Sequence, residues 1–102
     1  MNAGAEPMEC FCYIAECADG TYYTGWTTNP QRRIKEHNAG RGSRYTRARR
    51  PVRVVLVERQ TDRASAMRRE RAIKAMARSR KARLIAAASR FKRQAGARER
   101  RR

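Results

Sequence analysis

The segment 22–38 constrains the fold more than any other part of the sequence, because it contains a strand that leads almost directly into a helix. Tyr22–Trp26 is rich in aromatic residues that are typical of strands. Asn29 is a typical N-cap, and Pro30 suits the first helical position because its missing N–H would have no partner there. The helix is predicted to end before Gly40, which is a common stop signal.

A hairpin precedes this helix. Residues 11–17 have the aromatic and β-branched content of a strand, and Ala18-Asp19-Gly20 separates them from the next strand. A two-residue turn would place Tyr13 and Tyr23 on opposite faces of the hairpin. A three-residue loop pairs Ala15 with Tyr23 and places both tyrosines on one face. We favour the second register, because it puts Gly20 in the left-handed bulge position.

The second half of the chain contains one strong strand pattern followed by helical patterns. Residues 52–58 are almost continuously apolar, which predicts a central strand. A helix is predicted from Asp62 to about Arg78, with Glu70 on its core-facing stripe beside Ala66, Ile73 and Ala77. A shorter helix is predicted over residues 80–88, with Ser79 as its N-cap and Leu84 and Ile85 as apolar anchors.

Segments without an apolar face delimit a single domain. Residues 1–9 are interpreted as a flexible arm, residues 10–88 as the folded domain, and residues 89–102 as a disordered basic tail. Residues 39–50 are predicted to be a basic loop that is mobile when unbound.

The net charge of +17, from 26 Lys and Arg against nine Asp and Glu, favours a polyanionic partner. Nucleic acid is the first candidate and a membrane surface the second. Residues 78–102 carry +10 of this charge. Three cysteines and one histidine make a disulfide framework or a tetrahedral zinc site improbable. The sequence has no signal peptide and no apolar span, so we expect a soluble cytoplasmic protein.

Five residues could together cleave a phosphodiester bond. A tyrosine, Tyr13 or Tyr23, could deprotonate water, Arg33 could neutralise charge on the phosphorus oxygens, and Glu70 could hold a divalent ion. His37, one helical turn after Arg33, suits proton transfer. Each residue also has an ordinary interpretation: packing tyrosines, a solvated arginine, a surface histidine, and a glutamate paired with Lys74.

The order and spacing of these residues resemble the GIY-YIG nuclease family, especially its small single-domain members. The resemblance covers about residues 11–88 and includes several separate motifs. These are Phe11-Cys12-Tyr13, Tyr22-Tyr23-Thr24-Gly25, Arg32-Arg33 followed by His37-Asn38, Tyr45-Thr46-Arg47, and Glu70 before Ile73-Lys74.

The resemblance implies an α+β fold, with a three-stranded antiparallel sheet flanked by helices, and metal-dependent cleavage of nucleic acid. Members of the family differ in which of the two tyrosines is assigned as the base, and we favour Tyr13, with Tyr23 orienting water or phosphate. The resemblance implies that Arg33 stabilises the developing charge. His37 matches a helix position of the family, and Glu70 matches the single ligand of Mg²⁺ or Mn²⁺. The nucleic-acid-binding candidates are Gly25, Lys35, Arg41, Arg44, Tyr45, Arg47, Arg49, Arg50 and Lys74.

We therefore expect a structure- or strand-selective endonuclease that acts on DNA rather than RNA, associated with the nucleoid if the source is bacterial, and with a protein partner that supplies specificity. A non-catalytic DNA- or RNA-binding protein with the same fold is the alternative, and its affinity would fall steeply with salt. A basic structural or ribosome-associated protein is the third interpretation, and predicts that Tyr13 and Arg33 can both be replaced by alanine without consequence.

Overall fold

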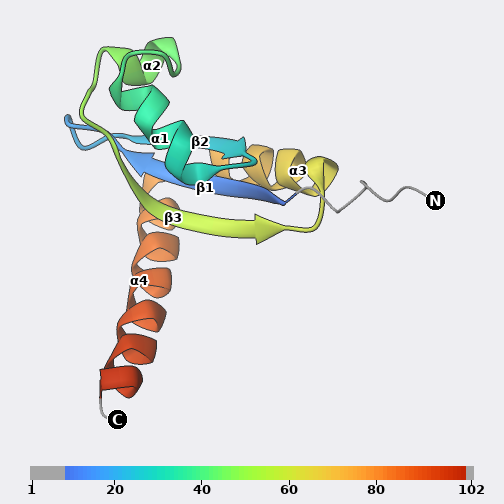
Figure 1. The fold of residues 1–102 in the computed structure, drawn as a ribbon, viewed down its shortest axis with the longest axis vertical. Helices are drawn as coiled ribbons and strands as arrows, with labels where there is room; N and C mark the ends of the chain where they lie inside the picture. Colours follow the sequence, from blue (N-terminus) through green and yellow to red (C-terminus); the bar gives the residue numbers. More distant parts are fainter. Residues whose placement is uncertain (1–8, 101–102) are drawn as a thin grey trace.

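A computed structural model describes the backbone of residues 9–100 and the side chains of residues 9–90. It confirms the α+β class, with a three-stranded antiparallel sheet flanked by helices (Figure 1). The predicted arm lies outside the described residues except for Glu9. The elements in chain order are β1 (Cys10–Glu16), β2 (Tyr22–Thr27), α1 (Pro30–Asn38), α2 (Arg44–Arg47), β3 (Arg53–Gln60), α3 (Arg63–Lys74) and α4 (Arg78–Arg100).

The hairpin has the predicted register. Ala15 pairs with Tyr23, and Tyr13 pairs with Gly25 on the same face of the sheet. The N–H of Cys17 donates to the carbonyl of Thr21 over 2.8 Å and closes a three-residue loop. Gly20 has φ of 84° in that loop, which is the left-handed conformation that glycine adopts without a Cβ clash.

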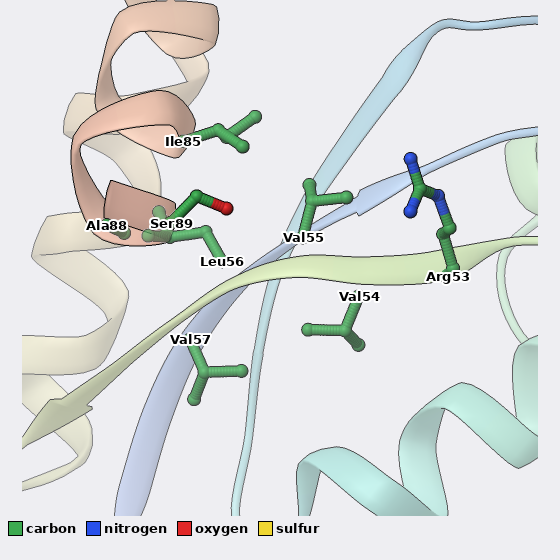
Figure 2. Close-up of a pocket in the computed structure, with 8 residues that line it drawn as sticks. All are labelled: Arg53, Val54, Val55, Leu56, Val57, Ile85, Ala88 and Ser89. Carbon is green, nitrogen blue, oxygen red and sulfur yellow. The ribbon is translucent and has the colours of Figure 1, made fainter. Parts of the chain in front are cut away.

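The strand order is β2-β1-β3, so the prediction that the apolar strand 52–58 is central was wrong. The central strand is β1, and β3 forms an edge. A register shift between Ile14 and Ala15 gives β3 an extra residue, so two neighbouring side chains turn to the same face. Figure 2 shows Val55 and Leu56 directed toward α4, while Val54 and Val57 point to the opposite side, where α1 lies.

The apolar run of β3 is covered mainly on the α4 face, because Leu56 is buried there and Val57 on the α1 face is exposed. Val55 and Leu56 pack with Ile14, Ile73 and residues of α4. On the other face, Val54 and Val57 line an apolar groove of about 600 Å³ next to α1.

The two faces of the sheet have separate cores. On the α1 face, Tyr13, Ala15, Cys17 and Val52 form a buried cluster against which Tyr23 and Ile34 pack. On the α3 and α4 face, one cluster forms around Cys10, Cys12 and Ala66, and another around Ile14, Leu56 and Ile73.

Helix α1 has its predicted limits. The side chain of Asn29 accepts from the N–H of Arg32, Pro30 is the first helical residue, and Gly40 follows the end with φ of 83°. The segment 39–50, predicted to be a loop, contains the short helix α2. Ser43 begins this helix by accepting from the N–H of Thr46 over 3.1 Å.

The limits of the last two helices differ from the prediction. The helix was predicted to begin at Asp62, and Asp62 is the N-cap of α3. Helix α3 ends at Lys74, so Ala77 lies outside it and is exposed. Ser79 lies inside α4 and is not its cap. Leu84 and Ile85 are the predicted anchors, and both pack on the core.

Helix α4 extends to Arg100, beyond the predicted end of the domain at residue 88. The tail was predicted to be disordered because it lacks an apolar face. Alanine, arginine and lysine have high intrinsic helix propensity, and this composition allows the helix to continue without a face to bury. No helix within residues 9–100 is long and apolar enough to cross a membrane.

Candidate active site

Four of the predicted site residues meet on the α1 face of the sheet. The hairpin register brings Tyr13 and Tyr23 together, with ring centroids 6.3 Å apart. His37 of α1 lies against both rings, at centroid distances of 6.0 Å and 5.2 Å. Arg33, one turn earlier in α1, interacts with the hydroxyl of Tyr13. The site therefore depends on a three-residue hairpin loop and on a helix that begins at a defined residue.

His37 is fully buried, so the interpretation of it as a surface residue was wrong. Its Nε2 lies 2.8 Å from Tyr13 Oη, and its Nδ1 lies 2.7 Å from Thr46 Oγ1. The hydroxyl of Thr46 also lies 3.2 Å from the carbonyl of Ser43, to which it can donate. We assign His37 the tautomer in which Thr46 accepts from Nδ1–H, and in this tautomer Nε2 accepts the hydroxyl proton of Tyr13.

The titration properties of this pair follow from burial. Burial, together with the charge of Arg33, lowers the pKa of His37 from its ordinary value of 6.5, so the imidazole is neutral at pH 7. Burial raises the pKa of Tyr13 to about 12, although Arg33 acts in the opposite direction. A neutral phenol therefore faces a neutral imidazole across this hydrogen bond.

Arg33 is positioned by α1 and remains partly accessible. Its Nη1 lies 3.0 Å from Glu36 Oε1, and about a third of each side chain is exposed. Burial alone would lower the pKa of Arg33, but its interactions with Glu36 and Tyr13 raise it. The guanidinium therefore stays charged beside the hydroxyl of Tyr13, where it can contact an anionic ligand.

Tyr45 extends the aromatic cluster away from His37. Its ring stacks on that of Tyr23 at a centroid distance of 6.2 Å, and the guanidinium of Arg49 lies 3.8 Å from its centroid. Arg49 also contacts Asp19 and the carbonyl of Tyr45, each at 3.0 Å. Arg49 therefore supports the loop as well as adding positive charge.

Glu70 lies on α3, which packs on β1 and β2 from the side of the sheet opposite α1. Its side chain is 19 % exposed, and its Oε2 lies 3.5 Å from Lys74 Nζ, so the pairing considered from the sequence is present. Its negative charge adds to burial in raising the pKa of Tyr13 and of Cys12. Glu70 thus acts electrostatically on the tyrosine of the α1 face from α3.

The donor atoms available for a metal are few. The described residues contain no group of three or more His, Cys, Asp and Glu side chains that could hold an ion. Mg²⁺ often uses one or two carboxylates and takes its remaining ligands from water and substrate phosphate. A single half-buried carboxylate at Glu70 fits that mode of binding and does not fit an all-protein metal cage.

The predicted nucleic-acid contacts divide into two groups. The first group is exposed on α1, α2 and the turn between them, and none of its members forms an ion pair with a described residue. It consists of Lys35, Arg41, Arg44 and Arg47. Arg50 instead donates to the carbonyls of Arg47 and Asn38, and Lys74 pairs with Glu70.

Gly25 does not have the role that the sequence suggested. It is buried, and a Cβ at this position would lie 2.6 Å from Tyr13 Oη. The glycine therefore makes room for the tyrosine ring and is closed to a nucleic acid backbone.

We expect Gly25→Ala to destabilise the protein by about 1–3 kcal/mol, because the added methyl group must displace a buried ring. Thermal unfolding should show a lower Tm, by roughly 4–8 °C for each kcal/mol in a domain of this size. The same substitution made in Tyr13→Phe should still be destabilising, since the ring atoms Cζ and Cε1 of residue 13 would lie 2.8 Å and 3.0 Å from the added Cβ. An unchanged Tm for Gly25→Ala would show that the ring does not occupy this space.

Sequence reasoning missed several residues that hold the site together. Thr46 and Ser43 orient His37, and a Cβ on Gly42 would overlap the imidazole ring. The side chain of Asn38 forms hydrogen bonds with both the N–H and the carbonyl of Val52 and so joins the end of α1 to the residue before β3. The Ser43 cap before Thr46 was a readable signal for α2, but nothing local linked Thr46 to a histidine on another helix.

Comparison with known proteins gives consistent matches. The family model of the GIY-YIG catalytic domain matches residues 9–83. A UPF0213 protein of Natronomonas pharaonis is 50% identical over 76 residues, covering 74% of this chain and 89% of that protein. A UPF0213 protein of Desulfotalea psychrophila is 55% identical over 78 residues, covering 76% and 71%.

Two solution NMR structures are also similar. The UPF0213 protein of Bacillus halodurans has a TM-score of 0.52 and 42% identity, over 78% of this chain and 85% of that chain. A protein of E. faecalis has a TM-score of 0.55 and 35% identity, over 79% and 86%.

Proposed function

We propose, on the premise that this chain belongs to the GIY-YIG family, that it is an endonuclease that hydrolyses phosphodiester bonds in nucleic acid. The catalytic domain of that family is a nuclease domain. The observation that carries the proposal is the buried hydrogen bond between Tyr13 Oη and Nε2 of the neutral His37, with Arg33 at the same hydroxyl. DNA is the preferred substrate in this proposal, as inferred from the sequence.

The Tyr13–His37 pair supports a proton relay. As the attacking water transfers a proton to Tyr13 Oη, Tyr13 passes its own proton to His37 Nε2, so that no free phenolate has to form. The imidazolium formed on His37 keeps its Nδ1–H bond to Thr46. Tyr13 is only 2 % exposed, so we place the water where Tyr23 and Arg33 border its hydroxyl.

The remaining residues act on the phosphate. Arg33 neutralises charge that develops on the phosphorus oxygens. Glu70 would hold one Mg²⁺ or Mn²⁺ ion, with Lys74 released from it. Such an ion, when bound, stabilises charge on the leaving oxygen. The exposed residues Lys35, Arg41, Arg44 and Arg47 contact neighbouring phosphates, which the net charge of +17 favours. We retain from the sequence analysis a cytoplasmic location and a protein partner that supplies specificity.

The test is a cleavage panel. Labelled single-stranded, duplex, flapped and junction forms of DNA and RNA are incubated with Mg²⁺, Mn²⁺ or EDTA. We expect cutting that requires a metal, prefers DNA and falls by about 10²–10³ in Arg33→Ala, because a preorganised charge is lost.

The matched control for this arginine is Arg53→Ala, which removes a guanidinium paired with Glu16 at the far end of β1. Its cleavage rate should stay within about threefold of wild type, since it changes only the general electrostatic attraction. Binding without cutting under every condition would instead support the non-catalytic nucleic-acid-binding protein.

A further inference from the structure

A pair of arginine–aromatic contacts lies outside the residues discussed so far, at β2 and the helices that follow β3. The guanidinium of Arg63, the first residue of α3, lies 5.3 Å from the ring centroid of Trp26. The guanidinium of Arg78, the first residue of α4, lies 4.4 Å from that of Tyr22. We call these four residues the stacking surface.

Both guanidinium groups have unused hydrogen-bonding capacity. Arg63 and Arg78 are exposed, and neither forms an ion pair or a hydrogen bond with another residue of the described part of the chain. Arg49, which lies over Tyr45 in the same way, is already bound to Asp19 and to a backbone carbonyl. The donors of the stacking surface are therefore available for an external acceptor, and a guanidinium plane on a ring leaves its outer face open for another planar group.

The two pairs lie on one face of β2. Tyr22 and Trp26 are both directed to the α3 and α4 face of β2 and are about 13 Å apart along the strand. Glu70 lies between Arg63 and Arg78 in the chain, on a helix that packs over the same strand. A ligand that reaches from one pair to the other therefore runs along the strand on which the helix carrying Glu70 packs.

Halfway between the two rings, the buried hydroxyl of Thr24 lacks a hydrogen-bond partner among the described residues. A buried hydroxyl without a partner is uncommon. Because the hydroxyl is itself buried, it belongs to the interior of the protein and is not a contact for a ligand on this surface.

We infer that the stacking surface binds unpaired nucleotides of the nucleic acid strand that is cleaved. Bases of an unpaired strand have free faces, which stack on aromatic rings and on guanidinium planes, and the arginine donors then meet the adjoining phosphates. Bases inside a duplex are already stacked on each other and cannot use the rings in this way. The inference rests on the proposed function for the identity of the ligand, and it assigns the substrate class: nucleic acid with an unpaired segment at the cut.

Trp26 allows a direct test, because it is the only tryptophan of the chain. The full-length protein is titrated in EDTA with a 12-nucleotide single strand and with a blunt hairpin duplex of matched length and charge. Tryptophan fluorescence is recorded together with the anisotropy of labelled oligonucleotide. We expect saturable quenching with the single strand, and at most a small fraction of that change with the duplex.

Three variants of equal charge separate stacking from general attraction. Arg63→Gln and Arg78→Gln should each weaken binding of the single strand at least about fivefold. Arg59→Gln is the control, because it removes the same charge from an exposed arginine that is paired with Glu9. Its affinity should change less than twofold at constant salt.

The possible results distinguish a failure of the stacking surface from a failure of the proposed nuclease function. Equal losses in all three variants, equal quenching by duplex and single strand, or binding by anisotropy without a change in fluorescence would each refute the stacking surface. Quenching with the expected variant pattern, in a protein that cuts nothing with Mg²⁺ or Mn²⁺, would support the surface and refute the nuclease. Cleavage of nucleic acid by a protein whose tryptophan fluorescence is not quenched would support the nuclease and refute the stacking surface.

Discussion

Glu70→Gln should abolish metal-dependent cleavage, with a loss of at least about 10²–10³ in rate, while the protein stays folded. The substitution keeps the size of the side chain and removes the negative charge that a divalent ion requires. Its cost in stability should be small, because the interaction lost is a pair with Lys74 at 3.5 Å, in which half of the lysine side chain is exposed. Such pairs contribute about 0–1 kcal/mol. Cleavage rate and thermal unfolding are measured on the same preparation.

Glu16→Gln is the matched control for this change. Glu16 is a partly exposed carboxylate paired with Arg53 at 2.7 Å, and it lies at the far end of β1. The control loses the same charge and the same kind of ion pair, so it should retain cleavage within about threefold. Undiminished cutting by Glu70→Gln would remove Glu70 from the metal site, and equal losses in both variants would show that only global charge matters.

Tyr13→Phe should lower the cleavage rate by at least about 10², because the proton path from water to His37 loses its middle oxygen. It should also destabilise the fold by about 1–3 kcal/mol, since His37 Nε2 is left buried without its donor. Rates are therefore compared well below the Tm of each variant. Tyr23→Phe should cost less in both respects, because the Tyr23 hydroxyl has no hydrogen bond within the described residues.

The pH profile separates the relay from simple loss of structure. His37 must be neutral to accept the proton, and burial lowers its pKa from 6.5. Wild-type cleavage should therefore persist at pH 6.5 and fall only at lower pH, as His37 becomes protonated. Tyr23→Phe should keep this acidic limb, and Tyr13→Phe should lose it. A larger rate loss for Tyr23→Phe than for Tyr13→Phe would make Tyr23 the base instead.

Local patterns predicted the elements that build the site, because their signals act over a few residues. Gly20 selected the three-residue loop, and with it the face shared by Tyr13 and Tyr23. Asn29 and Pro30 determined where α1 starts, and hence which way Arg33 and His37 point. These predictions needed only backbone stereochemistry and the geometry of a helix start.

Predictions that depended on what covers an element were less successful. The apolar run of β3 suggested a central strand. The same run of apolar residues also occurs in an edge strand when helices pack against it and a β-bulge turns two neighbouring side chains to one face. Ala77 matched the apolar stripe of α3, but the helix ends before it. The end of α4 was placed too early, because the absence of an apolar face was given more weight than the propensity of the backbone to stay helical.

The amino-acid sequence by itself determined the hairpin register, the start of α1 and the residue types of the site, since each follows from contacts between near neighbours in the chain. Only the tertiary structure decided the chemical state of those residues. The burial of His37 between Tyr13 and Thr46 lowers the pKa of its ring, and both partners lie on other elements of the fold. Gly25 likewise acquires its role from Tyr13 across the hairpin. A pKa depends on the solvent and the charges that surround a group in three dimensions, which short-range sequence patterns do not contain.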